Sequence, residues 1–435
     1  MSCTQTACLV SLILFSPASS VAQNVRPLTE FSSSQVEYVK TTGRIDLVQQ
    51  RWTVPVAGRS PISKWSCPVD GWPSLSLAGE IVLVQDAQGI RALNLQTGRS
   101  AWPAGEHDSG FLLQTDPRFE FPDREGSSSC LDGVVHGKFW TGTFAGRLVT
   151  LNLLAEGRLE WSRTPEDFQV ESDRKVDFAG GPIEIPGGLA ISLRESQLEE
   201  KRPRGWLVGI DLHGHTRWRA IVPPLPLANR HDACDAITAF GNHIYWNRSG
   251  QQFLSLEADT GVIAWQAELK NLQYERGTTH ECNAIFAESK ILIGTSGQIV
   301  RAFNPADGSL LWQQHLDSPV DSISGVHQGI VVIPGEHLTG LEASTGRILW
   351  QAGGTNDAGR GLGKGLILAD HVLWPTRQEL WTISLQSGQV LQRDALPQIT
   401  KAGGGNLLLR DQTLLIAAPQ QLTAFQVLLK TKKPR

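Results

Sequence analysis

Two histidines and two cysteines are the residues of this chain best suited to chemistry, because they occur as two similar pairs. His231 precedes Cys234 by three positions and His280 precedes Cys282 by two, with carboxylate residues beside both pairs. Imidazole and thiolate groups at such spacing are typical ligands of zinc or copper, so these four residues are a candidate metal site. Two other interpretations stay open, namely a disulfide between Cys234 and Cys282 and a pair of buried free thiols.

Two further cysteines, Cys67 and Cys130, are expected in adjacent structural units and form a second candidate disulfide. The other two cysteines, Cys3 and Cys8, precede or begin a short apolar run near the N-terminus. Four cysteines permit three pairings, and their spacing does not select one of them.

Other catalytic patterns do not occur in the sequence. It holds no Gly-x-Ser-x-Gly elbow, no phosphate-binding glycine loop, no His-Glu-x-x-His and no Cys-x-x-Cys-His. The formal net charge is −4, whereas a nucleic-acid surface needs a concentrated basic patch. No catalytic residue is assigned on these grounds, and no nucleic-acid partner is expected.

A repeated phrase indicates the elements that must position these residues. An alternating apolar stretch ends in a Thr-Gly or similar turn, and a tryptophan follows the glycine by four residues, as in Gly98 and Trp102. The phrase recurs at Gly157 and Trp161, Gly214 and Trp218, Gly261 and Trp265, Gly308 and Trp312, and Gly346 and Trp350. A seventh copy has Gly388 but Gln392 in the tryptophan position, and an eighth, 422–427, stops before the turn. Successive glycines lie 38 to 59 residues apart, which is typical of a propeller blade of four short strands.

The repeated tryptophans are predicted to be structural wedges between blades. Several copies have a small residue six positions before the turn glycine. These small residues are Ala92, Ser255, Ala302, Gly340 and Thr382. We expect each indole to pack over the small residue and against the neighbouring blade, because a buried indole covers about 150–250 Å². The predicted blade tryptophans are Trp52, Trp102, Trp161, Trp218, Trp265, Trp312 and Trp350.

The N-terminal strand around Trp52 is predicted to close the ring. The eighth copy lacks an outermost strand, and an unassigned strand-like stretch, 48–54, stands ahead of the first blade. Pairing the two removes an exposed sheet edge. The prediction is therefore an all-β, eight-bladed propeller of four-stranded antiparallel blades, with the last blade closed by an N-terminal strand.

The blade assignment places the cysteines at one end of the central channel. Cys130, Cys234 and Cys282 lie seven residues before the first inner turn of their blades, near the start of the innermost strands. The two His and Cys pairs are thus expected on neighbouring blades at the channel mouth.

The repeat also carries a family resemblance. The pattern Ala-Leu-Asn-x-x-Thr-Gly-x-x-x-Trp from Ala92 to Trp102 resembles the tryptophan-docking repeat of PQQ-dependent dehydrogenases and that of BamB-like scaffolds of outer-membrane protein assembly. The resemblance covers about residues 48–429 and implies the propeller fold rather than an activity. Quinoprotein alcohol dehydrogenases of this kind hold PQQ under a disulfide between adjacent cysteines, and no two cysteines are adjacent here. BamB-like scaffolds are lipid-anchored, and this sequence offers no lipobox.

The N-terminus is interpreted as an export signal. Residues 7–15 are apolar, too few to span a bilayer, and Ser20-Val21-Ala22 suits signal peptidase. The predicted division is a signal peptide at 1–22, an extension at 23–46, the propeller at 47–429 and a basic tail at 430–435. The mature protein is expected to be a periplasmic or extracellular monomer with no transmembrane segment.

The favoured function is a non-catalytic scaffold that binds a protein or envelope polymer through one propeller face. The alternative is a quinone- or metal-dependent oxidoreductase that uses the channel mouth. No cofactor is expected for the scaffold, and PQQ or a metal ion belongs to the alternative.

The long connections into blades 2, 3 and 4, together with a mixed-charge run from Arg194 to Arg204 that is read as a solvated hairpin tip, fall on one face. Phe111, Phe119 and Phe121 in the first connection are candidate partner anchors.

Overall fold

The structure is a computed structural model of the whole chain. It describes residues 45–56, 73–86, 88–102, 111–114, 133–195, 204–222, 235–248, 250–268, 285–288, 290–318, 320, 322–353, 359, 361–396, 405–418 and 420–429.

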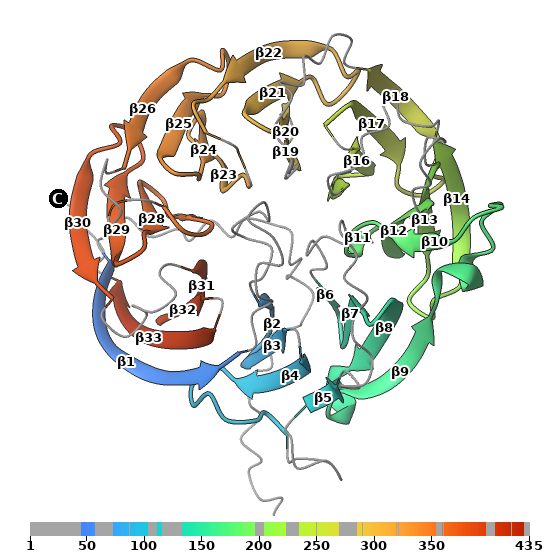
Figure 1. Cartoon of the computed structure of the whole chain (residues 1–435), viewed down its shortest axis with the longest axis horizontal. Helices are drawn as coiled ribbons and strands as arrows, with labels where there is room; N and C mark the ends of the chain where they lie inside the picture. The colour runs from blue at the N-terminus through green and yellow to red at the C-terminus, as the bar shows by residue number, and fades with distance from the viewer. Residues whose placement is uncertain are drawn as a thin grey trace, which may run out of the picture.

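Eight antiparallel sheets stand around a central axis as the blades of a propeller (Figure 1). Within each blade the strands follow one another outward from the axis in chain order, except in blade 8. Blade 1 holds β2 (Ser74–Ala78), β3 (Ile81–Gln85), β4 (Gly89–Asn94) and β5 (Phe111–Gln114), and blade 2 holds β6 (Val134–His136), β7 (Phe139–Phe144), β8 (Arg147–Asn152) and β9 (Arg158–Arg163). Blade 3 holds β10 (Val176–Phe178) and β11 (Ile183–Ile185), which both pair with β12 (Gly188–Glu195), followed by β13 (Gly205–Ile210) and β14 (Thr216–Val222).

The second half of the ring repeats this plan. Blade 4 holds β15 (Ala236–Phe240), β16 (His243–Arg248), β17 (Gln252–Glu257) and β18 (Ile263–Glu268), and blade 5 holds β19 (Ile285–Glu288), β20 (Ile291–Ser296), β21 (Ile299–Phe303) and β22 (Leu310–His315). Blade 6 holds β23 (Gly325–His327), β24 (Ile330–Ile333), β25 (Leu338–Glu342) and β26 (Ile348–Ala352), and blade 7 holds β27 (Leu366–Ile367), β28 (His371–Pro375), β29 (Glu379–Ser384) and β30 (Val390–Ala395). Two short 3-10 helices, η1 (Leu153–Ala155) and η2 (Pro165–Phe168), lie within the described residues.

Blade 8 is assembled from both ends of the chain. Its inner strands are β31 (Asn406–Arg410), β32 (Thr413–Ala418) and β33 (Gln421–Leu429), and its outermost strand is β1 (Ile45–Pro55). β1 and β33 pair antiparallel from Ile45 opposite Leu429 to Pro55 opposite Gln421, with two register shifts. The predicted eight-bladed ring, closed by an N-terminal strand, is confirmed.

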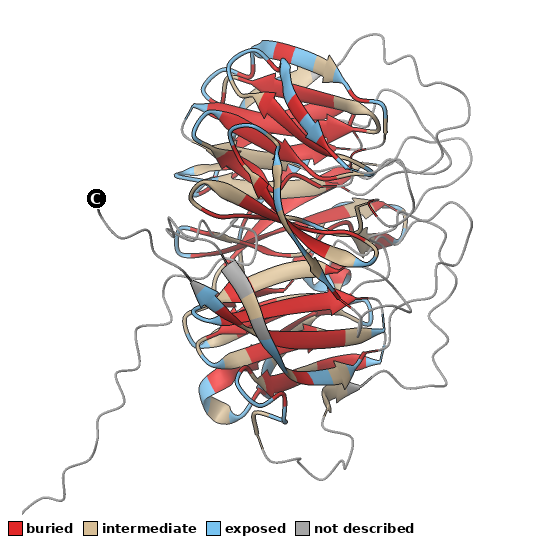
Figure 2. Cartoon of the chain, turned by 90° about the vertical axis from the view of Figure 1, so that its left-hand side faces the viewer, coloured by how far each residue is buried: buried red, intermediate tan, exposed pale blue. Residues whose placement is uncertain are grey.

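The core lies between the blades. Val82 and Leu93 of blade 1, for example, pack with Leu415 and Leu422 of blade 8 in one buried cluster. Both faces of the middle strands are therefore buried, which explains why these strands are almost continuously apolar. An edge-on view shows burial running through the inner strands, while exposed residues gather at turns and on outer strands (Figure 2). Within the described residues, no helix is long and apolar enough to cross a membrane.

Antiparallel order gives the ring two distinct ends. The connection face is the end where innermost strands begin and second strands finish, as at Glu195 and Arg248. The turn face is the opposite end, where the turn glycines such as Gly261 and Gly308 lie. Because β1 begins where β33 ends, Ile45 and Leu429 both lie at the turn face.

Six blade tryptophans reach the turn of the following blade through their indole nitrogens. The Nε1–H bonds to main-chain oxygens run from Trp52 to Leu95 (3.0 Å), Trp161 to Leu212 (2.9 Å), Trp218 to Ala258 (3.0 Å), Trp265 to Pro305 (2.8 Å), Trp312 to Ala343 (2.8 Å) and Trp350 to Leu385 (2.9 Å). Each ring also covers the turn glycine of that blade: a Cβ on Gly346, whose φ is +74°, would lie 2.4 Å from Trp312. The glycine is thus needed twice, for its positive φ and for the space its missing side chain leaves.

Small residues stand opposite the tryptophans within the same blade. Ser255 pairs with Trp265 and Ala302 with Trp312, as the spacing rule expects. Gly209 stands opposite Trp218 in the same way, and Thr150 stands opposite Trp161. These two residues do not lie exactly six positions before their turn glycines, because the turns differ in length, so the spacing rule did not find them. A Cβ on Gly209 would lie 2.2 Å from the Trp218 ring, so a larger residue there would displace the indole.

Blade 1 departs from the predicted pattern. Trp102 was expected early in the outermost strand, but it lies in a bend after the bridge between Leu93 and Ser100. The outermost strand β5 begins only at Phe111. The Trp102 ring still packs on the glycine of the next blade, Gly157.

The interface between blades 7 and 8 lacks a docked tryptophan for a topological reason. β33 and β1 come from opposite ends of the chain, so no turn joins the third and fourth strands of blade 8. Neither a turn glycine nor a turn carbonyl exists there to receive an indole. The corresponding residue of blade 7 is Gln392, whose amide donates to the Asp394 carboxylate at 2.7 Å.

Candidate binding face

Buried charge concentrates at and just below the connection face of blades 3, 4 and 5. Among the described residues, the charged residues that are buried as a whole are Glu195, Asp235, Arg248 and Arg301, and all four belong to these three blades. The Asp86 carboxylate of blade 1 is also buried, and it pairs with Arg91 at 2.8 Å. Burying a charge is costly unless it is paired and hydrogen-bonded. Such a concentration therefore marks a region whose geometry is held in place by specific polar contacts.

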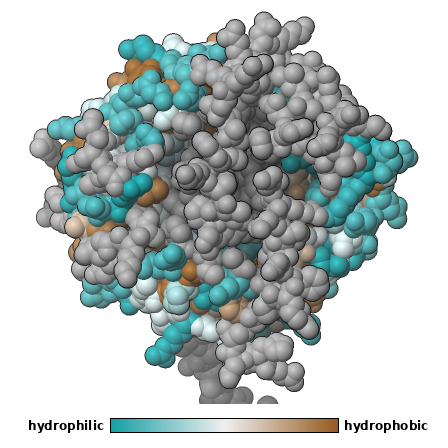
Figure 3. All heavy atoms as spheres, viewed as in Figure 1, coloured by the Kyte–Doolittle hydropathy of each residue, from teal (hydrophilic) through white to brown (hydrophobic). Residues whose placement is uncertain are grey.

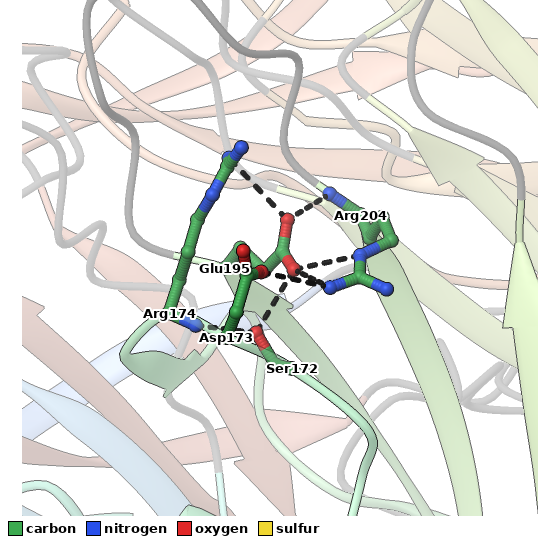
Figure 4. Close-up of polar contacts among 5 residues, drawn as sticks. All are labelled: Ser172, Asp173, Arg174, Glu195 and Arg204. Carbon is green, nitrogen blue, oxygen red and sulfur yellow. Dashed lines mark hydrogen bonds and ion pairs between the residues drawn. The ribbon is translucent and has the colours of Figure 1, made fainter.

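The Glu195 carboxylate is the centre of a polar network at the end of β12 (Figure 4). Its Oε1 accepts hydrogen bonds from the Ser172 hydroxyl at 2.9 Å and from Arg204 Nε at 2.7 Å. Its Oε2 accepts from the backbone N–H of Arg204 at 2.9 Å and lies 3.5 Å from Nη1 of Arg174. Both oxygens are thus occupied by donors, and the residue is only 2% exposed.

These contacts determine the protonation state of Glu195. Burial alone would raise the pKa of the carboxyl, but the backbone and side-chain hydrogen bonds from Arg204 and Ser172, with the Arg204 charge, outweigh it and lower the pKa. A carboxylate with a lowered pKa and occupied oxygens is a poor proton acceptor. Glu195 is therefore suited to holding structure rather than to acid–base catalysis.

The same network joins two segments that are separate in the sequence. Ser172, Asp173 and Arg174 precede β10 in the passage from blade 2 to blade 3, whereas Glu195 and Arg204 flank the segment 196–203. Arg204 Nη2 also pairs with the Asp173 carboxylate at 3.2 Å. The network therefore fixes the base of the blade 3 hairpin against the neighbouring passage.

The base of this hairpin corrects the sequence interpretation. The run from Arg194 to Arg204 was expected to be a solvated hairpin tip, but Glu195 is buried within the ion pairs just described. The alternating charges of the run did not predict the burial of Glu195, because buried and solvated ion pairs are made of the same types of residue.

Arg248 continues the polar layer from blade 4 back to blade 3. Its Nη1 donates to Gln252 Oε1 at 2.7 Å, and the guanidinium carbon lies 5.1 Å from the Trp246 ring centroid. A Cβ on Gly205 would lie 2.8 Å from Nη2, so the guanidinium rests against the backbone beside Arg204. This glycine of blade 3 leaves the space that the arginine of blade 4 occupies.

Asn247 makes the matching contact forward to blade 5. Its side-chain amide donates to the main-chain oxygen of Thr295 at 2.8 Å. Adjacent residues of a strand point to opposite faces, so Asn247 and Arg248 reach opposite neighbours. Together they hold blades 3, 4 and 5 in a defined spacing at the connection face.

The predicted metal and disulfide residues lie outside the described residues. This applies to His231, Cys234, His280, Cys282, Cys67 and Cys130. Asp235 directly precedes the innermost strand β15, Ile285 is the first residue of β19, and these two strands contact each other. Within the described part of the chain, no three His, Cys, Asp or Glu side chains are grouped to hold a metal ion. The metal site and both disulfides stay predictions.

The structure places one candidate anchor elsewhere than expected. Phe111 was assigned to the connection from blade 1 to blade 2, but it lies in β5 opposite Arg91. The Arg91 guanidinium carbon is 5.1 Å from its ring centroid, and the side chain is half-buried. The hydrogen-bonded ladder between β4 and β5 thus holds Phe111 at the outer edge of blade 1. Phe119 and Phe121 lie outside the described residues.

The described surface at the rim of the ring is mixed in character. Hydrophilic atoms predominate at the rim in Figure 3, with small hydrophobic patches between them. The buried polar layer of blades 3 to 5 fixes the ends of second and third strands beneath this surface.

The sequence profile of the family described as outer membrane protein assembly factor BamB matches residues 204–325 and 254–427, together just over half of the 435 residues. The chain is 24% identical over 212 residues to the outer membrane protein assembly factor BamB of Yersinia pestis, which is 44% of this chain and 52% of that protein. It is 27% identical over 122 residues to the outer membrane protein assembly factor BamB of Moranella endobia (strain PCIT), which is 26% of this chain and 30% of that protein. The chain therefore matches about half or less of the length of these curated relatives.

Solved structures share the architecture at low sequence identity. BamB from Moraxella catarrhalis superposes with a TM-score of 0.55 at 13% identity, covering 88% of this chain and 100% of that chain. The quinohemoprotein alcohol dehydrogenase ADHIIG from Pseudomonas putida HK5 superposes with a TM-score of 0.59 at 14% identity, covering 94% of this chain and 80% of that chain. These likenesses show the propeller fold alone. The profile match over more than half of the sequence, on an eight-bladed ring with docked tryptophans, shows that the chain belongs to the PQQ-like propeller family of the outer membrane protein assembly factor BamB.

Proposed function

We propose that this protein is an exported scaffold that binds a protein partner through its connection face and assists the assembly of outer-membrane proteins. Membership of the BamB family supports this function class, because its curated relatives are described as assembly factors. The expected export signal at 1–22 agrees with a periplasmic place of action. We propose that the protein acts there as a monomer. A protein is favoured over an envelope polymer because assembly factors act on proteins.

The observation that carries the proposal is the network around Glu195. It fixes two neighbouring segments of the connection face, the passage before β10 and the base of the hairpin after β12. Loops on a rigid scaffold are the usual site of recognition, and a rigid base lowers the entropy cost of binding. The connections between blades share this face, since every outermost strand ends there and every innermost strand begins there.

The proposal can be tested by complementation. The chain is expressed in a bacterium whose own BamB has been deleted, and the outer-membrane proteins are quantified by mass spectrometry. We expect the wild-type chain to raise their amounts toward normal. A variant with Phe119→Ser and Phe121→Ser, and another with Glu199→Gln, Glu200→Gln, Lys201→Gln and Arg202→Gln, should restore them at least several-fold less well.

The matched control lies at the opposite end of the ring. Glu156→Gln with Arg158→Gln changes exposed charges at the turn face and should complement as the wild type does. All variants should melt within a few degrees of the wild type. Failure of the wild-type chain in this host and in its own, or full activity of both connection-face variants, would show the proposal to be wrong.

A further inference from the structure

Each blade ends at the circumference of the ring in an outermost strand whose outer edge pairs with no further strand of the described residues (Figure 1). Proteins usually protect such an edge with charged side chains, with proline or by keeping the strand very short, because its free N–H and C=O groups can pair with another chain. Six of the eight outermost strands have one of these features. β5 has four residues, and the other five strands include the charged residues Arg51 (β1), Arg158, Glu160 and Arg163 (β9), Arg217 and Arg219 (β14), Glu268 (β18), and Arg393 and Asp394 (β30).

β22 and β26, the outermost strands of blades 5 and 6, are the exceptions. Their sequences, Leu-Leu-Trp-Gln-Gln-His and Ile-Leu-Trp-Gln-Ala, include no Asp, Glu, Lys, Arg or Pro. The contrast is clearest at the residue before the docked tryptophan, which lies at the register shift of each blade. This residue is Glu160 in blade 2 and Arg217 in blade 3, whereas it is Leu311 in blade 5 and Leu349 in blade 6. Since the tryptophans of blades 2 and 3 dock beside a charged residue, the blade fold does not require leucine at this position.

Both uncharged strands also begin with exposed apolar side chains. Leu310 and Leu311 are 51% and 50% exposed, and Ile348 and Leu349 are each 37% exposed. Side chains on neighbouring strands stabilise a sheet by packing across the strand pair. These apolar pairs therefore offer packing partners to a strand added at the edge.

The hydrogen-bond ladder of blade 5 shows which backbone groups of β22 face outward. The Leu316 N–H donates to the main-chain oxygen of Gln298 at 2.8 Å, so these two residues form a hydrogen-bonded pair. Hydrogen-bonded and non-hydrogen-bonded pairs alternate along an antiparallel ladder, so Gln314 bonds inward to β21, whereas Gln313 and His315 direct their backbone groups outward. The outward oxygen of His315 accepts a hydrogen bond from the Gln314 side-chain amide at 2.8 Å. The backbone N–H of another strand can take the place of this surface contact.

The chemistry of these edges indicates what fits them. Backbone donors and acceptors at strand spacing are matched by the backbone of an extended polypeptide, whereas the backbone groups of a helix are already bonded to one another. The lack of charge in both strands and the exposed apolar pairs favour a segment of uncharged and apolar residues.

A second copy of this ring is a poorer match than a flexible chain. The circumference is convex (Figure 1), so two rings would meet along a single outermost strand of six residues in blade 5 or five in blade 6. Such a strip falls short of the roughly 1,000 Å² that a stable protein interface buries. An extended segment of an unfolded chain needs no matching curvature and can follow either edge.

We propose that the outer edges of blades 5 and 6 bind extended, uncharged segments of unfolded polypeptides by strand addition. The added strand pairs its backbone with β22 or β26 and packs apolar side chains on Leu310 and Leu311 or on Ile348 and Leu349. This surface lies on the circumference of the ring and is separate from the connection face. The inference therefore does not depend on the proposed function.

Fluorescence anisotropy tests the proposal with the full mature chain. The probe is a short fluorescein-labelled peptide of alternating threonine and valine. A second peptide has the same side chains but carries a methyl group on every backbone nitrogen, so it cannot donate the hydrogen bonds of a strand pair. We expect saturable binding of the first peptide and no binding of the second.

Two variants change the edges without touching the inward ladder. Leu311→Lys with Leu349→Lys places a basic residue where blade 3 has Arg217, and it should weaken peptide binding several-fold. His315→Pro removes an outward N–H of β22, a place where an edge strand tolerates proline. This variant should lower the amount of peptide bound at saturation, because the edge of β26 stays available.

Leu391→Lys is the matched control for the lysine variant. Leu391 occupies the equivalent position of blade 7 and is 49% exposed, but its strand already includes Arg393 and Asp394. The control should bind the peptide as the wild type does, and melting curves of all variants should show an intact propeller.

Three results would overturn the proposal: wild-type protein that does not bind the peptide, equal binding of the methylated peptide, or an equal loss of binding in the control. A dimer in analytical ultracentrifugation that Leu311→Lys with Leu349→Lys dissociates, without peptide binding, would assign the edges to a second copy instead.

Discussion

The indole nitrogen of Trp350 donates a hydrogen bond to the main-chain oxygen of Leu385 in the next blade, at 2.9 Å. The same ring lies over Gly388, whose φ is +68° and whose Cβ, if present, would lie 2.6 Å from the indole. The Trp350 side chain thus contacts both the main-chain acceptor and the glycine of the following turn. Repetition of this contact around the ring fixes the spacing of the blades.

Trp350→Ala should lower the free energy of unfolding by about 3–5 kcal/mol, because it removes a buried ring and leaves a cavity between blades. Trp350→Phe should cost about 1–3 kcal/mol, since it keeps most of the apolar contact but leaves the Leu385 oxygen without its donor. Urea denaturation measures both. A cost for the phenylalanine variant equal to that of the alanine variant would contradict the assigned role of the indole N–H.

Gln392→Trp should not stabilise the ring, although it restores the repeated pattern. Blade 8 has no turn glycine and no turn carbonyl opposite this position, because β33 and β1 are not joined by a turn. A tryptophan there has nothing to dock on and also displaces the contact with Asp394. An increase in melting temperature would show that docking does not need the turn.

Deletion of residues 23–56 should markedly lower the melting temperature. It removes β1, with its ladder to β33 and the bond from Trp52 to Leu95, and leaves an open sheet edge. Deletion of 23–44 alone keeps β1 and is the matched control. Equal melting temperatures for the two truncated proteins would show that closure by β1 does not stabilise the ring.

Glu195→Gln should destabilise the protein at neutral pH by about 1.5–3 kcal/mol, the range for hydrogen bonds to a charged group. Because the pKa of Glu195 is lower in the folded than in the unfolded chain, its stabilising contribution is complete above the ordinary glutamate pKa. The contribution is lost as the pH falls through the lowered native pKa. The difference between wild type and variant should therefore shrink in acid, as measured by urea denaturation across pH.

The exposed Glu171, in the same passage, provides the control for this experiment. Glu171→Gln should change the stability by no more than about 0.5 kcal/mol, as most surface substitutions do. A pH-independent difference for Glu195→Gln would mean that shape rather than charge accounts for the loss.

No dye-linked dehydrogenase activity toward alcohols or sugars is expected, with or without added PQQ and calcium. The sequence has no adjacent cysteines, whereas the resembling alcohol dehydrogenases hold the quinone beneath such a pair. The measurement is dye reduction by the purified protein with PQQ present. Turnover that requires PQQ and is lost on replacing His231 and His280 would support the oxidoreductase alternative.

The repeat alone determined the architecture of this protein. A positive-φ glycine and a tryptophan four residues later are local requirements of one turn and the strand that follows. They therefore stay visible in sequence at Gly261 and Trp265 as well as at Gly308 and Trp312. The truncated last copy and the unassigned strand around Trp52 were sufficient to predict closure, because sheet edges favour pairing.

Tertiary structure decided what the residues of the connection face do. In the sequence, Glu195 is one charge within a run expected to be solvated. In the folded chain, Ser172, Arg174 and Arg204 surround its carboxylate. Arg248 is buried because a neighbouring blade supplies a glycine, Gly205, at the point where its guanidinium lies. Local spacing fixes which turn a residue belongs to, but burial and ion pairing depend on which blades stand side by side, and only the closed ring sets those distances.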